Sequence, residues 1–62
     1  MNLALNGGPF DGTEDHIPTT YDPEFGYPSY YDRADGNGHM HRYVLRLGPI
    51  EEPVQYDYQL EV

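Results

Sequence analysis

Apolar and polar residues alternate without exception along residues 54–62. Every even-numbered position in this stretch holds Val, Tyr or Leu, and every odd-numbered position holds Gln, Asp or Glu. A period of two places all the apolar side chains on one face of a β-strand, and Val and Tyr suit a half-buried pleated surface. The pattern therefore predicts a strand over residues 54–62 with Tyr56, Tyr58 and Leu60 facing the core.

Shorter alternations predict three more strands, over residues 2–6, 13–17 and 39–47. If 39–47 pairs antiparallel with 54–62, its apolar residues lie on the same side as those of the last strand, and the pair forms the core. The residues of 39–47 that share this face are His39, His41, Tyr43, Leu45 and Leu47.

Glycine and proline mark the turns between these strands. Residues 7–12 read Gly-Gly-Pro-Phe-Asp-Gly, in which Pro9 favours a tight turn and Gly12 tolerates a positive φ. The Lys and Ser or Thr that complete a phosphate-binding loop are absent, so this turn is predicted to be structural. Residues 48–53 contain two prolines and form a stiff link to the last strand.

Residues 19–38 keep neither a helical nor a strand period and are predicted to form one long loop rich in Tyr, Pro and Gly. Long loops inside compact domains commonly have a function, and aromatic rings provide large contact area at low entropic cost. We therefore predict that the aromatic residues of the loop bind a partner, while some of the rings also fold back over the sheet. These residues are Tyr21, Phe25, Tyr27, Tyr30 and Tyr31.

No segment has the pattern of a substantial helix. The expected fold is one small all-β domain over residues 1–62, a three- to four-stranded antiparallel meander with the long loop. A chain of this size buries only about 60% of its unfolded surface. Because the chain has no cysteine to form disulfides, a partner subunit is an expected source of stability.

Charge narrows the range of partners. Eleven carboxylates face three arginines and no lysine, which gives a formal net charge of -8. Such a surface repels phosphate, so neither direct binding to nucleic acid nor binding to an anionic membrane is expected. The charge fits a basic protein partner, or mimicry of nucleic acid toward a protein that binds it; the alternative is that it only maintains solubility.

The sequence predicts no enzyme, no cofactor and no metal site. Ser29 is the only serine, and it follows a proline in the loop, so no nucleophilic triad is formed. His39 and His41 lie on one face of a strand, with Asp35 and His16 as possible neighbours, but nothing fixes the third and fourth ligands that a structural zinc requires. Exposed histidines beside an interface are the favoured interpretation.

Residues 5–12 read Leu-Asn-Gly-Gly-Pro-Phe-Asp-Gly, and Tyr56-Asp57-Tyr58 stands near the other end. With these two features the chain resembles small uncharacterised proteins of actinobacteria and their tailed phages, which open with Leu-x-Gly-Gly-Pro-x-Asp-Gly and end in a strand with a Tyr-x-Tyr pair. The resemblance implies a phage or actinobacterial origin and carries over no functional residue.

Charge, aromatic loop and resemblance together predict a bacteriophage structural protein. We expect an accessory or decoration subunit of the capsid or tail, such as a minor capsid protein, made in the host cytoplasm and located in the virion. Its partners would be other virion proteins of the capsid or tail, or copies of itself. The alternative is an acidic phage-encoded inhibitor, or DNA mimic, that binds a host protein.

Overall fold

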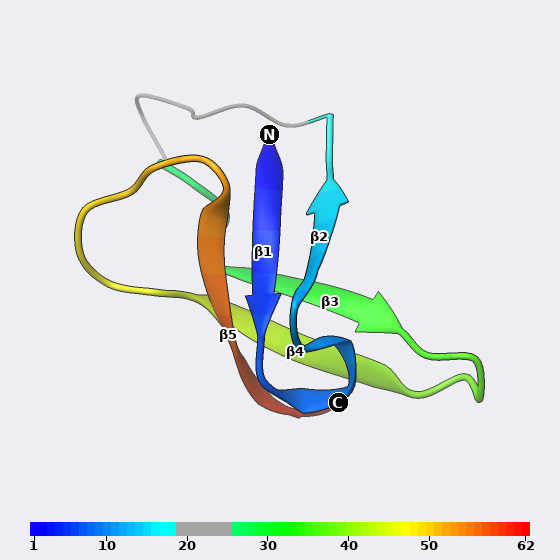
Figure 1. Cartoon of the computed structure of the whole chain (residues 1–62). Helices are drawn as coiled ribbons and strands as arrows, with labels where there is room; N and C mark the ends of the chain where they lie inside the picture. The colour runs from blue at the N-terminus through cyan, green and yellow to red at the C-terminus, as the bar shows by residue number, and fades with distance from the viewer. Residues whose placement is uncertain (19–25) are drawn as a thin grey trace.

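The computed structural model describes residues 1–18 and 26–62, which form a single five-stranded sheet in the order β2-β1-β5-β4-β3 (Figure 1). The all-β prediction is confirmed, and the only helical turn of the described residues is a short 3-10 helix, η1. None of these residues belongs to a helix long and apolar enough to cross a bilayer. The elements are β1 (Asn2–Asn6), η1 (Gly8–Phe10), β2 (Thr13–His16), β3 (Tyr30–Ala34), β4 (Met40–Leu45) and β5 (Val54–Glu61).

The sheet is mixed, because its first and last strands lie side by side and parallel. β1 pairs with β5 in parallel, whereas the β1–β2, β3–β4 and β4–β5 pairs are antiparallel. The predicted antiparallel meander of three or four strands is therefore wrong in strand number and in topology. Alternation shows which residues share a face of a strand, but it does not show which strand lies beside it.

β3 occupies part of the segment that was predicted to be a loop. It pairs with β4 from Tyr30 opposite Val44 to Ala34 opposite Met40. Its residues show no apolar alternation, since one of its two inward-facing side chains belongs to an arginine, Arg33. The predicted loop over 19–38 is thus wrong for Tyr30–Ala34.

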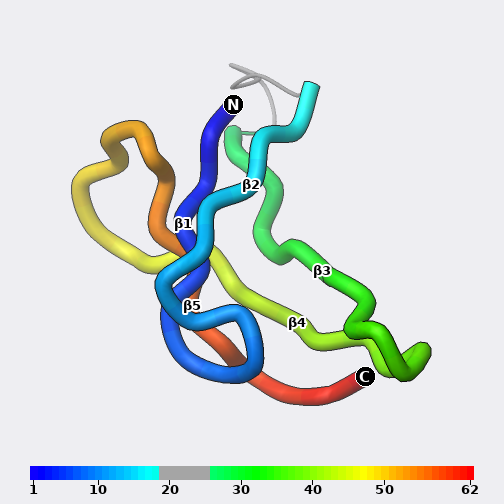
Figure 2. The backbone as a smooth tube through the Cα atoms, turned by 45° about the vertical axis from the view of Figure 1, so that its right-hand side comes forward, coloured from blue at the N-terminus to red at the C-terminus, as the bar shows by residue number. Residues whose placement is uncertain are grey.

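The sheet curls around the core. Figure 1 shows β1 and β2 running steeply across β3 and β4, and Figure 2 shows the same arrangement turned by 45° about the vertical axis. The inner faces of both halves supply the apolar side chains, and the partly buried Phe10, Tyr31 and Tyr58 pack around them. The fully buried residues are Leu3, Leu5, Tyr43, Val54 and Tyr56.

Side chains join the two edge strands, which stand at opposite ends of the strand order. The Tyr31 hydroxyl of β3 donates a hydrogen bond to Asp15 Oδ2 of β2 at 2.7 Å. Arg33 Nη1 of β3 lies 3.1 Å from Asp15 Oδ1. Burial and the hydrogen bond to the Asp15 carboxylate raise the pKa of Tyr31 to about 12. Asp15 therefore holds the curled sheet together along its open side.

A β-bulge in β5 reverses the alternation near the end of that strand. Tyr58 pairs with Tyr43 while Leu60 pairs with Arg42, so Gln59 is an extra residue without a partner of its own. Leu60 consequently lies on the outer face, the face turned away from the core, and is 44% exposed. The predicted core position of Leu60 is wrong for this reason.

Of the other predicted core residues, some are buried and one is exposed. Tyr43 and Tyr56 are fully buried, as predicted. Leu47 is 94% exposed because β4 ends at Leu45 and the chain turns away from the sheet.

Candidate functional site

An exposed apolar surface extends across β3, β4 and the end of β5 on the outer face. Ala34 lies opposite Met40, and the Val62 amide donates a hydrogen bond to the Met40 carbonyl at 2.7 Å. Leu60 stands opposite Arg42, two residues further along β4. We call these exposed residues the outer patch: Tyr30, Ala34, Met40, Leu60 and Val62.

Arg42 orders the centre of the outer patch. Its guanidinium binds Asp32 through two hydrogen bonds of 2.9 Å each and lies 4.2 Å from the centre of the Tyr30 ring. The hydrogen bond lowers the pKa of Asp32 and raises that of Arg42. The charges at the centre are therefore paired, and the half-exposed Tyr30 ring is held by a cation–π contact.

The structure separates the aromatic residues that were predicted to bind a partner. Tyr30 is 50% exposed in the outer patch. Tyr27 and Tyr31 are partly buried against the core, as expected for rings that fold back over the sheet. Tyr21 and Phe25 lie outside the described residues. Their role in binding a partner remains a prediction.

A second site, which is polar, lies on the inner face, where the β3–β4 hairpin meets β5. His41 is only 6% exposed; its Nε2 lies 2.8 Å from Asp35 Oδ2 and its Nδ1 lies 3.2 Å from the Tyr58 hydroxyl. A carboxylate only accepts hydrogen bonds, so Nε2 donates to Asp35, while Nδ1 is within hydrogen-bond distance of the Tyr58 hydroxyl.

Asp35 is fixed by the hairpin turn itself. Its Oδ1 accepts hydrogen bonds from the backbone amides of Asn37 and His39 at 2.7 and 3.1 Å, which leaves Oδ2 for His41. The hydrogen bond from His41, and then the one from the Asn37 amide, lower the pKa of Asp35 to about 2. Asp35 is therefore an anion in a defined orientation at neutral pH.

The bulge adds Glu61 to this site. Glu61 pairs with His41, and its Oε1 lies 3.1 Å from Nδ1 of His39. One potential ligand atom each from Asp35, His41 and Glu61 lies within 4.8 Å of the others. We call these residues, together with His39, the hairpin cluster. Sequence reasoning found Asp35 and both histidines but missed Glu61, because regular alternation places Glu61 on the face of the strand that is turned away from the core.

His16, the remaining predicted neighbour of the histidine pair, lies elsewhere. It is exposed on β2, and its Nδ1 lies 2.7 Å from Asn2 Oδ1. The expected approach of His16 to His39 and His41 is therefore wrong.

The turn of residues 7–12 covers one side of the hairpin cluster. The Tyr43 hydroxyl donates to the Gly7 carbonyl at 2.7 Å and accepts from the Phe10 amide at 3.0 Å, which fixes η1 over the core. Phe10 then presents its ring edge-on to His41, with the ring centres 5.9 Å apart. The turn is structural, as the sequence predicts, and it shields His41 from water.

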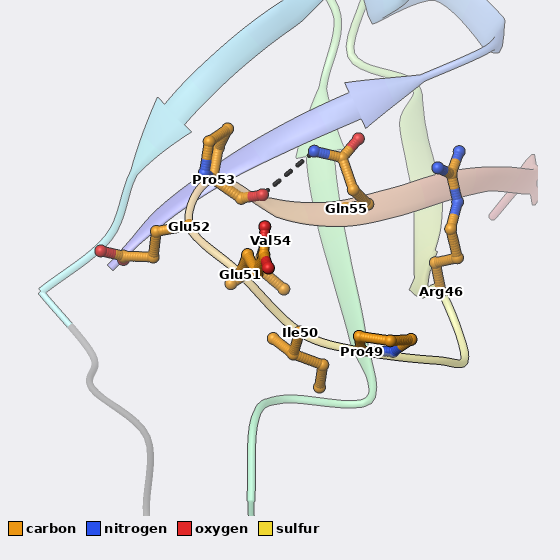
Figure 3. A pocket seen from close by; sticks show the side chains of 8 residues that line it. All are labelled: Arg46, Pro49, Ile50, Glu51, Glu52, Pro53, Val54 and Gln55. Carbon is orange, nitrogen blue, oxygen red and sulfur yellow. Dashed lines mark hydrogen bonds between the residues drawn. The ribbon is translucent and has the colours of Figure 1, made fainter.

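A hollow of about 380 Å³ lies under the β4–β5 connection (Figure 3). Its walls include Pro49, Ile50 and Glu51, and the Gln55 side chain closes one side by donating to the Pro53 carbonyl at 3.0 Å. The Arg46 guanidinium in its wall is already bound to Asp57 at 2.6 and 2.9 Å. The hollow lies where β5 begins, whereas the hairpin cluster lies where β5 ends, and the lining of the hollow holds no Ser, Thr, Cys or Lys.

Comparisons of the chain with protein-family models, curated proteins and solved structures find no match. The resemblance to actinobacterial and phage proteins therefore remains a prediction, and function has to be inferred from the outer patch and the hairpin cluster.

Proposed function

We propose that the protein is a non-enzymatic binding subunit, and that it attaches to another protein through the outer patch. The observation that supports this function is the exposed position of Leu60 and Val62 next to Met40, produced by the bulge at Gln59. Exposed apolar residues grouped on one surface are typical of interaction sites. Tyr30, held by Arg42, adds a large and already oriented ring, the kind of residue that dominates binding energy.

The charge of the chain indicates what kind of partner it binds. Each of its three arginines is paired with an aspartate of the same molecule: Arg33 with Asp15, Arg42 with Asp32 and Arg46 with Asp57. Each arginine is thus compensated within the molecule, and the remaining net charge of -8 acts on the surroundings. The matching partner is a protein with an apolar surface inside a basic rim.

The predicted resemblance suggests where such a partner is found. We propose a virion protein of a tailed phage, with the chain as an accessory or decoration subunit in the virion. The alternative, a DNA mimic, requires rows of free carboxylates. Asp15, Asp32 and Asp57 each bind an arginine instead, so the geometry favours the binding subunit.

A virion incorporation assay tests the proposal. A tagged copy of the chain is produced during growth of the phage, virions are purified on a density gradient, and the tagged chain is quantified by mass spectrometry. Leu60→Asp should fold, because Leu60 is already half exposed, and its content in virions should fall at least about tenfold, equivalent to about 1.4 kcal/mol.

Leu47→Asp is the matched control, since it introduces the same change at a leucine that is exposed outside the outer patch. It should be incorporated like the wild type. Absence of the wild-type chain from virions would refute the location, and equal incorporation of the Leu60→Asp and wild-type chains would refute the outer patch as the binding surface.

A further inference from the structure

We infer that the hairpin cluster is a zinc-binding site, with Asp35, His41 and Glu61 as ligands and His39 as the fourth. This site is separate from the outer patch and does not depend on the proposed function. It is built from two elements far apart in sequence, the β3–β4 hairpin and the end of β5.

The donor set suits zinc. Two imidazoles and two carboxylates provide nitrogen and oxygen ligands, which zinc binds at about 2.0–2.2 Å in tetrahedral geometry. In such a site neighbouring ligand atoms stand about 3.3 Å apart. His41 Nε2 and Asp35 Oδ2 lie 2.8 Å apart, and His39 Nδ1 and Glu61 Oε1 lie 3.1 Å apart. Each pair needs to open by only a few tenths of an ångström, and the two pairs must also move toward each other, because His39 lies outside the group of Asp35, His41 and Glu61 whose ligand atoms stand within 4.8 Å of one another.

The atoms of His41 and Asp35 that do not face the site are already held by hydrogen bonds. Asp35 Oδ1 is fixed by two backbone amides, so that Oδ2 remains as the ligand. When zinc replaces the proton on His41 Nε2, that proton is carried by Nδ1, which then donates to the Tyr58 hydroxyl oxygen at its present distance of 3.2 Å. Metal-binding histidines almost always have such a hydrogen-bond partner on the other nitrogen, and it fixes the ring orientation.

The surroundings of the site allow an ion to enter from solvent and leave no uncompensated arginine beside it. His39 and Glu61 are exposed, with side chains 58% and 52% accessible, so the ion enters from solvent on their side. Phe10 covers His41 on the inner side. Arg33, which pairs with His41 across β3 and β4, lies over Phe10 and binds Asp15, so its charge is already compensated.

Titration of the purified chain with zinc chloride against a chromophoric chelator measures the affinity. NMR of the histidine rings shows which residues bind. We expect one zinc ion per chain, with the ring signals of His41 and His39 shifted at saturation and those of His16 unchanged. Glu61→Gln and His39→Asn alter exposed side chains and should each weaken binding at least about tenfold while the circular dichroism spectrum stays the same.

Two control variants separate this site from nonspecific binding to an acidic chain. Glu51→Gln removes an exposed carboxylate, and His16→Asn an exposed histidine, outside the cluster; both should bind zinc like the wild type. The inference is overturned if zinc does not saturate a single site below about 1 mM, an affinity of only about -4 kcal/mol. It is also overturned if the control variants weaken binding as much as Glu61→Gln does.

Discussion

At the scale of single residues, the hairpin cluster depends on how one buried imidazole is hydrogen-bonded. His41 has a carboxylate at one nitrogen and a phenol at the other, both within hydrogen-bond distance. Buried polar groups are tolerated only when they are paired in this way. Asp35 therefore links the hairpin turn to the core, besides its inferred role as a ligand.

This link predicts a specific dependence of stability on pH. The pKa of Asp35 in the folded chain, about 2, lies below its ordinary value of 3.8, chiefly because His41 donates to it. A lowered folded-state pKa adds stability above the ordinary value, and this contribution is lost as the pH falls from about 4 toward 2. Asp35→Asn should thus unfold at a lower urea concentration than the wild type at pH 6, with the difference shrinking as the pH falls to 2.

Urea titrations of both proteins at several pH values measure this difference. Asp32→Asn serves as the comparison, since the pKa of Asp32 is also lowered but by Arg42 on the outer face. It should not change the ring signals of His41 in NMR spectra, whereas Asp35→Asn should. A constant gap between wild type and Asp35→Asn from pH 6 to 2 would contradict the proposed link.

At the scale of elements, the sequence predicts most strands but not their neighbours. Strong alternation correctly predicts the strand at Val54–Glu61, and weaker alternation predicts those at Asn2–Asn6 and Met40–Leu45 approximately. β3 escapes prediction because Arg33 faces inward, where its guanidinium lies over the Phe10 ring and binds Asp15 in the folded chain. An arginine gives no apolar signal in the sequence, although its side chain can face the core when the fold supplies suitable neighbours.

The bulge is the second element that alternation cannot reveal. The polar and apolar residues of 54–62 continue to alternate through Gln59, although the face they occupy changes there. As a result Leu60 was expected in the core and Glu61 in solvent, whereas Leu60 belongs to the outer patch and Glu61 to the hairpin cluster. The sequence thus predicts the histidine pair and Asp35, but only the cross-strand register completes the candidate site.

Deleting residues from β5 tests the bulge directly. Deletion of Gln59 should be tolerated, with a loss of at most about 1–2 kcal/mol, because it removes the extra residue and leaves Leu60 opposite Arg42. Deletion of Gln55 should abolish folding, because it shifts the register of β5 by one residue. Either Val54 or the rest of the strand must then turn its apolar side chains away from the core.

Circular dichroism and urea unfolding of the two deletion variants provide the comparison, which is matched because both remove one glutamine from the same strand. Unfolding of both variants would show that the extra residue is required for the curl of the sheet. Folding of both would show that the register of β5 is not fixed by its buried face.

At the scale of the whole molecule, a single sheet encloses its own core. A five-stranded sheet of this size has no second layer within the described residues, so its two halves cover each other, and the edges β2 and β3 face across the open side. Asp15 connects them with hydrogen bonds to both Tyr31 and Arg33, and Thr13 Oγ1 accepts a longer one from Arg33 at 3.3 Å. The stability of the fold should therefore depend on this one carboxylate more than on its exposed neighbours.

Asp15→Ala should destabilise the chain by about 1–3 kcal/mol, because it leaves the Tyr31 hydroxyl and the Arg33 guanidinium without their shared acceptor. Glu14→Ala, one residue earlier in the same strand and exposed, should change the free energy of unfolding by no more than about 0.5 kcal/mol. Urea unfolding of the two variants at pH 7 gives both values. The Tyr31 pKa, followed by absorbance, should fall from about 12 toward 10 in Asp15→Ala, since burial alone remains to raise it. Equal losses of stability in the two variants, or an unchanged Tyr31 pKa, would show that the edges are held together by apolar packing and not by Asp15.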